Sequence, residues 1–408
     1  CWGVQAQAQN RRGPTRSSAI GWRKTRQQAP RAGPLIIDLA ASDTSPTLSC
    51  GIKQGWACMN ILLLSPYDAV SHQYWRRQIT AGFPAHHFEV LTLPARYFGW
   101  RVRGNAMTLA DQVTADQVAQ TDLVLATSMT DLATLKGLVP GLAGVPCILY
   151  FHENQFAFPS RQASDRDLAA QMTSIYSALA ATQLVFNSAF NRDTFFAGAK
   201  ALLRKMPDGV PAEVLASQEF NALVLPVPIP DPLFNRTPSV RRPDLVWNHR
   251  WEHDKGPERL LEIVQAYVAS GLPGKCHIVG QQFRTIPPAI SEAIALLTAH
   301  QLLGEKGYIE NLTQYHALLA QSQFVLSTAD HEFQGLAVME AMALGCLPVV
   351  PDALVYPEYV PAESRYTTAA EAVQRLAHPA GYAPRDCVAP MAFQAQAESW
   401  HNLFIRLV

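Results

Sequence analysis

The sequence predicts an α/β protein built from two Rossmann-like domains in tandem. Across most of the 408 residues, short apolar runs typical of buried parallel strands alternate with helical patterns. A chain of this length exceeds one ordinary hydrophobic core, and a proline-dense stretch at residues 226–244 interrupts the alternation. Proline lacks a backbone donor, so we expect neither a helix nor a central strand in this stretch. The expected boundaries are a first domain at 59–230, a linker at 231–243 and a second domain at 244–390.

The first domain contains six expected strands. They are Ile61–Leu64, Phe88–Leu93, Leu123–Ala126, Cys147–Phe151, Leu184–Phe186 and Leu223–Val227. Amphipathic segments such as Asp167–Ala181 lie between them. This alternation predicts a parallel sheet with helices on both faces.

The second domain repeats the pattern. Its expected strands are Leu245–Asn248, His277–Gly280, Lys306–Ile309, Phe324–Ser327 and Leu347–Val350. Its expected helices are Glu258–Ser270, Pro288–His300, Leu312–Gln321 and Gly335–Leu344. Ligands of such sheets bind at the carboxyl ends of the strands, so we expect the site in the loops there, in a cleft between the domains.

The composition indicates a soluble globular protein, with 48% hydrophobic and 16% charged residues. No run of about 18 apolar residues occurs, so we expect no membrane span. The seven cysteines show neither metal-site nor disulfide-framework spacing. Cys147, Cys276 and Cys346 lie in apolar surroundings and read as buried thiols, which favours a reducing compartment, the cytoplasm.

The first 58 residues differ from the rest of the chain. They hold eight Lys or Arg and two Asp, a net charge of +6, so residues 59–408 carry −6 in a chain of net charge zero. The segment lacks periodicity, and Met59 directly precedes a strand-like run. We interpret residues 1–58 as a disordered or non-native extension with the natural start at Met59; a basic arm and a targeting peptide are the alternatives.

The stretch STADHEFQGLAVMEAMALGCLPVV, residues 327–350, carries two glutamates eight positions apart, Glu332 and Glu340. We expect a strand, a loop holding Glu332, and a helix from Gly335 that holds Glu340. The helix start suits a phosphate, and the carboxylates suit hydroxyls of a sugar or a ribose. The alternative is that Glu340 is an ordinary helix residue and that Glu332 is a solvated loop residue.

The stretch WNHRWEHDKGPE, residues 247–258, lies between an expected strand and an expected helix. Arg250 and Lys255 are cations where the second domain would hold a diphosphate. A solvated charged loop is the alternative. We assign no metal to this loop.

Polar residues also follow the strands of the first domain. The stretch YFHENQFAFP places four of them directly after a buried strand: His152, Glu153, Asn154 and Gln155. The stretch VFNSAFN places Asn187 and Ser188 after the next strand. We expect these residues in the cleft; a satisfied core histidine for His152 and a helix N-cap for Ser188 are the alternatives.

Two further loops are candidates for contact with a second substrate. Ser71 and His72 follow the first strand in a stretch that does not match a dinucleotide fingerprint. The stretch LPARYFGWRVRGNAM interleaves arginines, among them Arg101 and Arg103, with aromatic residues. Aromatic faces and arginines suit nucleobases and phosphates, whereas a solvated loop with buried aromatics is the alternative.

Taken together, these motifs resemble a known family. EFQGLAVMEAMALGCLPVV resembles the signature of retaining glycosyltransferases of the family 4 type, with two glutamates separated by seven residues. That resemblance implies the GT-B fold, two Rossmann-like domains facing across a cleft, with a final helix at 391–408 crossing back to the first domain. With LYFHENQFAFP, VFNSAFN, NHRWEHDKGPE and LVYPEYVPAE, residues 59–408 resemble the tRNA-queuosine α-mannosyltransferases more closely.

The resemblance implies transfer of mannose from GDP-mannose to the cyclopentenediol of queuosine in the anticodon of an aspartate tRNA, without cofactor, metal or membrane. It places the donor on Arg250, Lys255, Glu332, Phe333, Gln334, Gly335 and Glu340. It assigns catalysis to His152, Arg250, Lys255 and Glu332. The acceptor side would comprise Ser71, His72, Arg101, Arg103, Glu153, Asn154, Gln155, Asn187 and Ser188.

Two features depart from the resemblance. Residues 200–244 match the family poorly, and residues 59–408 are net acidic although a tRNA binder depends on phosphate contacts. A basic face would compensate for this charge; its expected members are Arg96, Arg101, Arg103, Arg161 and Arg166. The rival interpretations are a glycosyltransferase of the same fold with a lipid or polysaccharide acceptor, and a non-catalytic nucleotide-sugar or RNA-binding protein.

Overall fold

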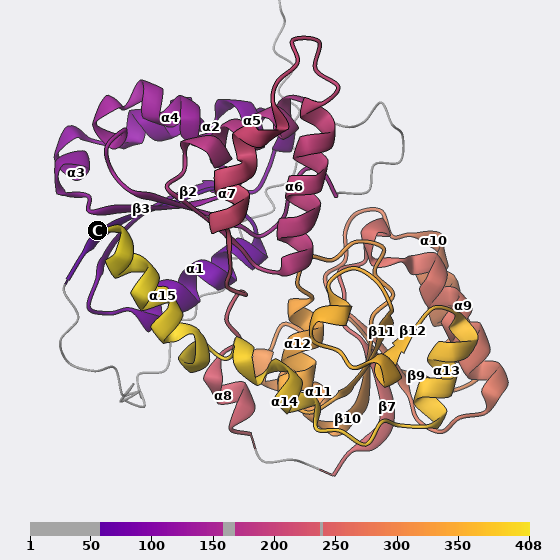
Figure 1. Cartoon of the computed structure of the whole chain (residues 1–408). Coiled ribbons are helices and arrows are strands. Elements are labelled where there is room, and N and C mark those ends of the chain that lie inside the picture. Colours follow the sequence, from indigo (N-terminus) through magenta and orange to yellow (C-terminus); the bar gives the residue numbers. More distant parts are fainter. Residues whose placement is uncertain (1–57, 158–167, 237–239) are drawn as a thin grey trace, which may run out of the picture. The chain divides into compact units, whose positions relative to one another are not determined.

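The structure, a computed structural model, describes residues 58–157, 168–236 and 240–408. All of these fall in one compact unit, Gly55–Val408. Within it the chain forms two six-stranded sheets, each with helices on both faces (Figure 1). The expected α/β architecture of two Rossmann-like domains is therefore confirmed. The interpretation of residues 1–58 falls almost entirely outside the described part and stays a prediction.

The first sheet is parallel throughout and has the order β2-β1-β3-β4-β5-β6. Its strands are β1 (Asn60–Asp68), β2 (His87–Pro94), β3 (Leu123–Thr127), β4 (Cys147–Phe151), β5 (Gln183–Phe186) and β6 (Leu223–Val224). Every residue of β3, β4 and β5 is buried, which explains why these strands read as continuous apolar runs rather than alternating patterns.

Helices cover both faces of this sheet (Figure 1). One face carries α2 (Phe98–Gln112), α3 (Ala115–Gln120), α4 (Leu132–Leu138), α5 (Leu168–Ala180), α6 (Ala189–Leu203) and α7 (Ala216–Asn221). The other face carries α1 (Val70–Gly82) and the last helix, α15 (Phe393–Leu407). Trp400 and Phe404 of α15 are fully buried beside Trp75 of α1. The end of the chain thus completes the core of the first domain, as the family resemblance implies.

The second sheet is also parallel, with the order β12-β11-β10-β7-β8-β9. Its strands are β7 (Arg242–Trp247), β8 (Cys276–Val279), β9 (Leu303–Gly307), β10 (Ser322–Leu326), β11 (Leu347–Pro351) and β12 (Arg365–Tyr366). Its helices are α9 (Pro257–Ser270), α10 (Pro288–Ala299), α11 (Leu312–Gln321), α12 (Leu336–Ala343), α13 (Ala369–Ala377) and α14 (Pro384–Val388). The third expected strand of this domain was placed three residues too late.

The proline-rich stretch differs from its prediction. A short helix, α8 (Asp231–Phe234), lies within it, with Pro232 in the first turn, where its missing N–H costs nothing. Its end belongs to β7, a central strand that pairs with β10 and β8. Pro243 is tolerated there because it is the second residue of that strand, before the regular pairing from Leu245 onward.

Two side chains of the second domain, those of Gln334 and Glu358, form hydrogen bonds with the backbone of the first domain. The Gln334 side-chain amide donates to the Val227 carbonyl and accepts from the Val227 N–H, both at 2.9 Å. The Glu358 carboxylate accepts hydrogen bonds from the N–H groups of Ala189 and Phe190, at 3.0 and 2.6 Å. A carboxylate at a helix start satisfies unpaired donors, so Glu358 caps α6 from the other domain.

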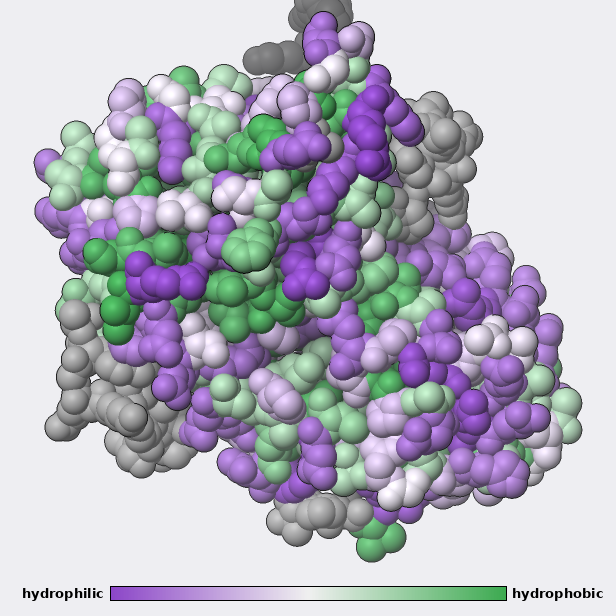
Figure 2. Space-filling view, in the orientation of Figure 1, coloured by the Kyte–Doolittle hydropathy of each residue, from purple (hydrophilic) through white to green (hydrophobic). Residues whose placement is uncertain are grey.

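The surface hydropathy and the cysteines were both subjects of the sequence predictions. On the face in Figure 2, hydrophilic residues spread over α9 and α13, whereas hydrophobic ones gather between α15 and α7. In the described part of the chain, no helix is both long and apolar enough to span a bilayer. Cys147, Cys276 and Cys346 are free and buried, as expected.

Candidate active site

Two loops of the second domain meet where the neighbouring strands β7 and β10 end. The Lys255 ammonium joins them, because its Nζ donates to the Glu332 carboxylate at 3.0 Å and to the His331 carbonyl at 3.1 Å. Asp254 Oδ2 lies 3.2 Å from the same Nζ. The sequence placed Lys255 and Glu332 in one site, and the structure brings them into direct contact.

The loop after β7 can reach this position because of Gly256. Its backbone is left-handed, with φ +61°, and a Cβ atom there would lie 1.9 Å from the Thr328 carbonyl oxygen. The Thr328 hydroxyl donates to the Lys255 carbonyl at 2.7 Å and accepts from the Trp247 indole at 2.9 Å. The end of β7, the lysine loop and the end of β10 are therefore fixed to one another.

Charge in this cluster is fixed by the ion pair. Burial alone would raise the pKa of the Glu332 carboxyl, but Lys255 lowers it to about 2. Burial alone would lower the pKa of Lys255, but Glu332 and Asp254 raise it above its ordinary value. Both groups are therefore charged at neutral pH. The Glu332 carboxylate also accepts from the Phe333 N–H at 3.2 Å, which orders the turn before Gly335.

Arg250 is the more accessible cation of the site. Its side chain is 52% exposed and lies 2.8 Å from the Glu252 carboxylate and 3.6 Å from that of Asp254. An exposed arginine can donate hydrogen bonds from its planar guanidinium to a phosphate. The buried Lys255 contributes a positive charge at a fixed position instead.

Glu340 lies in α12 and faces Tyr74 of α1. Burial raises the pKa of the Glu340 carboxyl to about 7, although the nearby Tyr74 hydroxyl opposes this effect. Burial also raises the pKa of Tyr74 well above its ordinary value, with Glu340 adding to the shift. The Glu340 carboxyl is therefore partly protonated near neutral pH.

His152 follows β4 and lies in an aromatic enclosure. Its ring centroid is 4.1 Å from that of His72, 5.0 Å from that of Trp75 and 4.7 Å from that of Tyr150. Burial lowers the pKa of His152 well below its ordinary value and that of His72 to about 4, so both rings are neutral. Both ring nitrogens of His152 are buried without a partner in the described structure. Unpaired buried nitrogens are costly, so the predicted role of His152 in substrate contact stays compatible with this geometry.

Glu153 brings the first domain into the electrostatics of this site. Burial raises the pKa of its carboxyl above the ordinary value, while Arg250 and Lys255 oppose this shift. Tyr67, at the end of β1, responds to the same groups: burial and Glu153 raise its pKa, and Arg250 lowers it. Glu153 of the FHENQ motif therefore lies within electrostatic reach of Arg250 and Lys255 of the RWEHDK motif.

Several predicted contact residues have structural roles. Asn154 Nδ2 donates to Asn191 and Thr194 of α6, and its Oδ1 accepts from the Phe156 N–H of its own loop. The Asn187 side chain donates to the His152 carbonyl at 2.9 Å. Ser188 is the N-cap of α6. Asn154 and Asn187 thus hold the HENQ loop in place, instead of presenting their amides to a substrate.

Phe333 and Gln334 also differ from the expected donor contacts. Phe333 is buried between rings, with centroids 6.0 Å from Phe190 and 4.5 Å from His331. The amide of Gln334 is occupied by the Val227 backbone. Within residues 332–335, the Glu332 carboxylate and the backbone at Gly335 stay the predicted donor contacts.

The remaining acceptor candidates lie on the first domain. Ser71 and His72 were expected in a loop but belong to α1, because β1 extends to Asp68. Arg101 and Arg103 were likewise expected in a loop and belong to α2. Gln155 is half-buried, with its amide 3.9 Å from the Met129 sulfur. Two members of the expected basic face, Arg161 and Arg166, lie outside the described residues.

Sequence reasoning missed four residues of the site: Tyr67, Tyr74, Asp254 as a partner of Lys255, and Thr328. Tyr67 has a detectable signal, because it ends a strand like the other site residues. Tyr74 has none, because its contact with Glu340 depends on how the domains meet.

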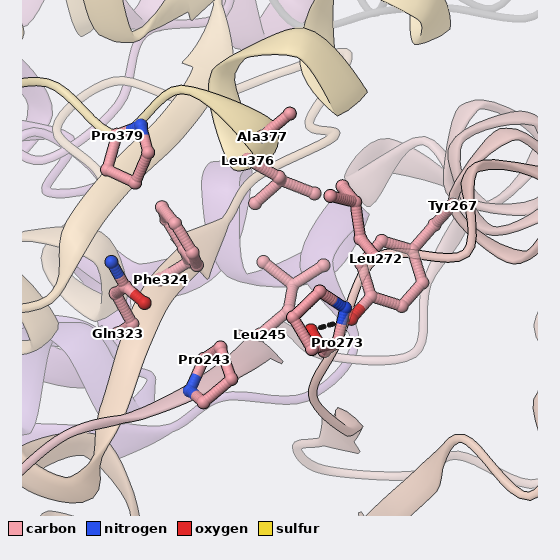
Figure 3. Close-up of a pocket in the computed structure, with 10 residues that line it drawn as sticks. All are labelled: Pro243, Leu245, Tyr267, Leu272, Pro273, Gln323, Phe324, Leu376, Ala377 and Pro379. Carbon is pink, nitrogen blue, oxygen red and sulfur yellow. Dashed lines mark hydrogen bonds between the residues drawn. The ribbon is translucent and has the colours of Figure 1, made fainter.

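A cavity in the second domain is separate from this site (Figure 3). It has a volume of about 160 Å³ and lies near the amino ends of β7 and β10, between Leu245, Phe324 and Leu376. The Tyr267 hydroxyl donates to the Pro273 carbonyl beside it, at 2.9 Å. This apolar space lies at the opposite end of the strands from Lys255. Among residues 58–157, 168–236 and 240–408, no cluster of three or more His, Cys, Asp or Glu side chains could hold a metal ion.

Two family models match the chain. Residues 60–229 match a model described as tRNA-queuosine alpha-mannosyltransferase N-terminal, and residues 234–379 match one described as glycosyl transferases group 1. The tRNA-queuosine alpha-mannosyltransferase of Drosophila melanogaster is 31% identical over 364 residues, which are 85% of this chain and 91% of that protein.

More distant relatives share only parts or only the fold. A GDP-mannose:cellobiosyl-diphosphopolyprenol alpha-mannosyltransferase of Xanthomonas campestris is 27% identical over 53% of this chain and 52% of that protein. Sucrose-phosphate synthase from Thermosynechococcus elongatus superimposes with a TM-score of 0.62 at 16% identity, over 86% of this chain and 99% of that one. Such structural neighbours identify the fold as GT-B.

Proposed function

The chain belongs to the tRNA-queuosine alpha-mannosyltransferase family, and from this premise we propose that it transfers mannose from GDP-mannose to queuosine in a tRNA. The finer details belong to the same proposal: attachment to the cyclopentenediol of the modified base, in the anticodon of an aspartate tRNA, with retention at the sugar carbon. The partners are a nucleotide-sugar and a tRNA, and the compartment is the cytoplasm.

One observation carries this proposal beyond family membership. The Lys255–Glu332 ion pair of the second domain lies within electrostatic reach of Glu153 in the first domain. Donor-side charges and the expected acceptor loop therefore share one site. A glycosyl transfer needs this arrangement, because donor and acceptor must be held together while the bond to the diphosphate breaks.

The leaving group is a diphosphate that gains negative charge as the bond between the sugar carbon and oxygen breaks. Arg250 and Lys255 supply fixed positive charge. Gly335 is the N-cap of α12, and the free backbone N–H groups at this helix start suit a phosphate. Such preorganised charge is usually a large contribution to catalysis. We expect no metal or cofactor to be required, because these side chains supply the charge.

The configuration at the reacting mannose carbon is retained if the acceptor hydroxyl attacks that carbon on the same face from which the diphosphate departs. The acceptor proton then passes to an oxygen of the departing phosphate, and the products are the mannoside and GDP. Glu332 holds mannose hydroxyls, Glu340 holds the ribose, and neutral His152 contacts the sugar through a ring nitrogen. On the acceptor side, Glu153 is the group best placed to contact the diol.

A lipid or polysaccharide acceptor is the second candidate. The partial relationship to the Xanthomonas campestris enzyme favours it, because that enzyme's name describes a diphosphopolyprenol acceptor. The match to the family-specific N-terminal domain over residues 60–229 favours tRNA instead, since the acceptor is expected on that domain. A non-catalytic binding protein would not need the paired cations and carboxylates of the cleft residues.

Single-turnover transfer of radiolabelled sugar tests the proposal. The full chain is incubated with GDP-mannose or UDP-hexoses and with tRNA from cells that contain or lack queuosine. We expect label only from GDP-mannose and only in queuosine-containing tRNA. Label in neither tRNA, together with slow hydrolysis of GDP-mannose, would overturn the tRNA acceptor and retain the glycosyltransferase.

A further inference from the structure

The start of α2 exposes aromatic side chains that no part of the proposed chemistry uses. Tyr97 is 73% exposed, Trp100 56% and Phe98 37%, and Met107 adds another exposed side chain two turns later. Exposed aromatic residues gathered on one segment mark an interaction site rather than an ordinary surface. The opposite side of α2 is buried, so these residues do not belong to the core.

This aromatic segment is held in a fixed position. The Trp100 indole lies across Gly104, where an added Cβ would come within 2.6 Å of the ring. Tyr97 has a left-handed backbone, with φ 55° and ψ 54°, which is costly for a tyrosine and common at functional sites. Asn105 anchors the helix, because its amide donates to the Met129 carbonyl at 3.1 Å and its oxygen accepts from the Asp131 N–H at 3.0 Å.

The segment is basic although residues 59–408 as a whole are acidic. Residues 93–110 contain Arg96, Arg101 and Arg103 and no acidic residue, while residues 59–408 together carry −6. The Arg96 guanidinium lies 5.7 Å above the centre of the Tyr97 ring. Arginines beside exposed rings match the phosphates and bases of a single-stranded nucleic acid.

The aromatic segment is continuous with the active site. The Phe98 ring meets that of Tyr67 edge to face, with centroids 5.8 Å apart. Tyr67 in turn responds electrostatically to Glu153 and Arg250. Tyr67 thus connects the aromatic segment to the surroundings of Glu153.

We propose that Tyr97, Phe98 and Trp100, with Arg96 and Arg103, form a stacking platform for unpaired bases of the acceptor RNA loop beside the modified base. This inference rests on the proposed function and adds the surface that binds its macromolecular substrate. Single-stranded RNA is the occupant, because unstacked loop bases are recognised by aromatic faces and arginine planes. A protein partner would have less use for three arginines in a stretch of sequence, residues 93–110, that holds no acidic residue.

Binding of a fluorescein-labelled anticodon stem-loop RNA to the full chain, followed by anisotropy, tests the platform without requiring transfer. We expect Trp100→Ala to weaken binding roughly 5- to 150-fold, the range measured for loss of one stacked base. Phe220→Ala is the matched control, because this aromatic side chain of α7 is 89% exposed and lies outside the segment. It should bind like the wild type.

Two further variants separate binding from folding. Gly104→Ala keeps the indole but forces it from its position, and we expect weaker binding. Tyr97→Gly removes the ring and relieves the left-handed backbone, so binding should fall while the melting temperature does not. Arg96→Gln should reduce the slope of log Kd against log salt by roughly 0.7, as expected for one lost phosphate contact.

The outcomes distinguish the platform from the transferase. Wild-type transfer to queuosine tRNA with unchanged RNA binding by Trp100→Ala and Tyr97→Gly would overturn the platform and leave the proposed function standing. RNA binding that depends on Trp100, with no transfer by the wild type, would support the platform and overturn the mannosyl transfer.

Discussion

Replacing Lys255 by methionine removes the cation between Glu332 and Asp254 while keeping the length of the side chain. The drop in the pKa of Glu332 from its ordinary 4.5 to about 2 corresponds to about 3 kcal/mol. Because burial opposes that drop, breaking the pair should cost about 3–5 kcal/mol of unfolding free energy. The buried ion pair therefore leads us to expect a loss of stability as well as a loss of turnover.

The sign of the pH dependence follows from the same pair. The folded pKa of Glu332 lies below its unfolded value, so the stabilisation is present above about pH 4.5 and is lost as the pH falls toward 2. Urea unfolding at pH 7 and pH 3 measures this effect. The unfolding free energies of the wild type and Lys255→Met should differ less at pH 3 than at pH 7.

A second substitution separates folding from catalysis. Lys255→Met with Glu332→Gln removes both charges, so we expect the unfolding free energy to recover most of the loss. Transfer should stay at least about 100-fold below wild type in both variants, because the leaving-group charge is no longer matched.

The control is Lys275→Met, which makes the same change at an exposed residue directly before β8. Its ammonium donates to the carbonyl of the exposed Gln301, so the substitution should alter unfolding little and transfer not at all. Wild-type transfer by the stable double variant would refute the role of Lys255 in leaving-group stabilisation.

Three further expectations concern neighbouring groups. Burial raises the pKa of Glu340 to about 7, so the folded protein binds a proton that the unfolded chain releases, and stability should fall by up to about 3 kcal/mol as the pH rises from about 4.5 past 7. Urea unfolding at pH 5 and pH 8 measures this dependence, and Glu340→Gln should reduce the difference in unfolding free energy between the two pH values. An equal difference in the wild type and the variant would contradict the raised pKa of Glu340. Gln334→Ala should lower stability by about 1–3 kcal/mol, because it leaves backbone groups unpaired; a raised KM for GDP-mannose with unchanged stability would instead place Gln334 in the donor site. Gly256→Ala should lower transfer at least about 10-fold, because its Cβ would lie 1.9 Å from the Thr328 oxygen. Gly271→Ala is its control, with a similar φ of +65° and no atom within 4 Å; equal effects of both would show that only backbone strain matters.

The fold was predictable because both sheets are parallel and buried on both faces. Strands such as β3 and β4 then read as unbroken apolar runs, which cannot be mistaken for alternating surface strands. The errors lie where local rules compete with packing. Pro243 enters a central strand at its second residue, and β1 runs on to Asp68, so Ser71 lies in a helix.

The candidate site was predictable in part because polar residues at the carboxyl ends of parallel strands share one edge. Lys255 and Glu332 could be placed together on this basis. Asn154 and Asn187 satisfy the same rule, yet they bond to the backbone and to α6. The rule locates side chains at an edge but cannot say which way each one turns.

Local patterns in the sequence were enough to predict the two-domain α/β plan, the strand ends that carry chemistry, and the family motifs. The proximity of Glu340 to Tyr74 and the contact between Phe98 and Tyr67 arise from packing between distant segments, which no local pattern reveals. The tertiary structure also set the protonation of Glu332 and Glu340 apart, at pKa values of about 2 and about 7. The physical reason is that charge and contact depend on neighbours brought together from distant parts of the chain.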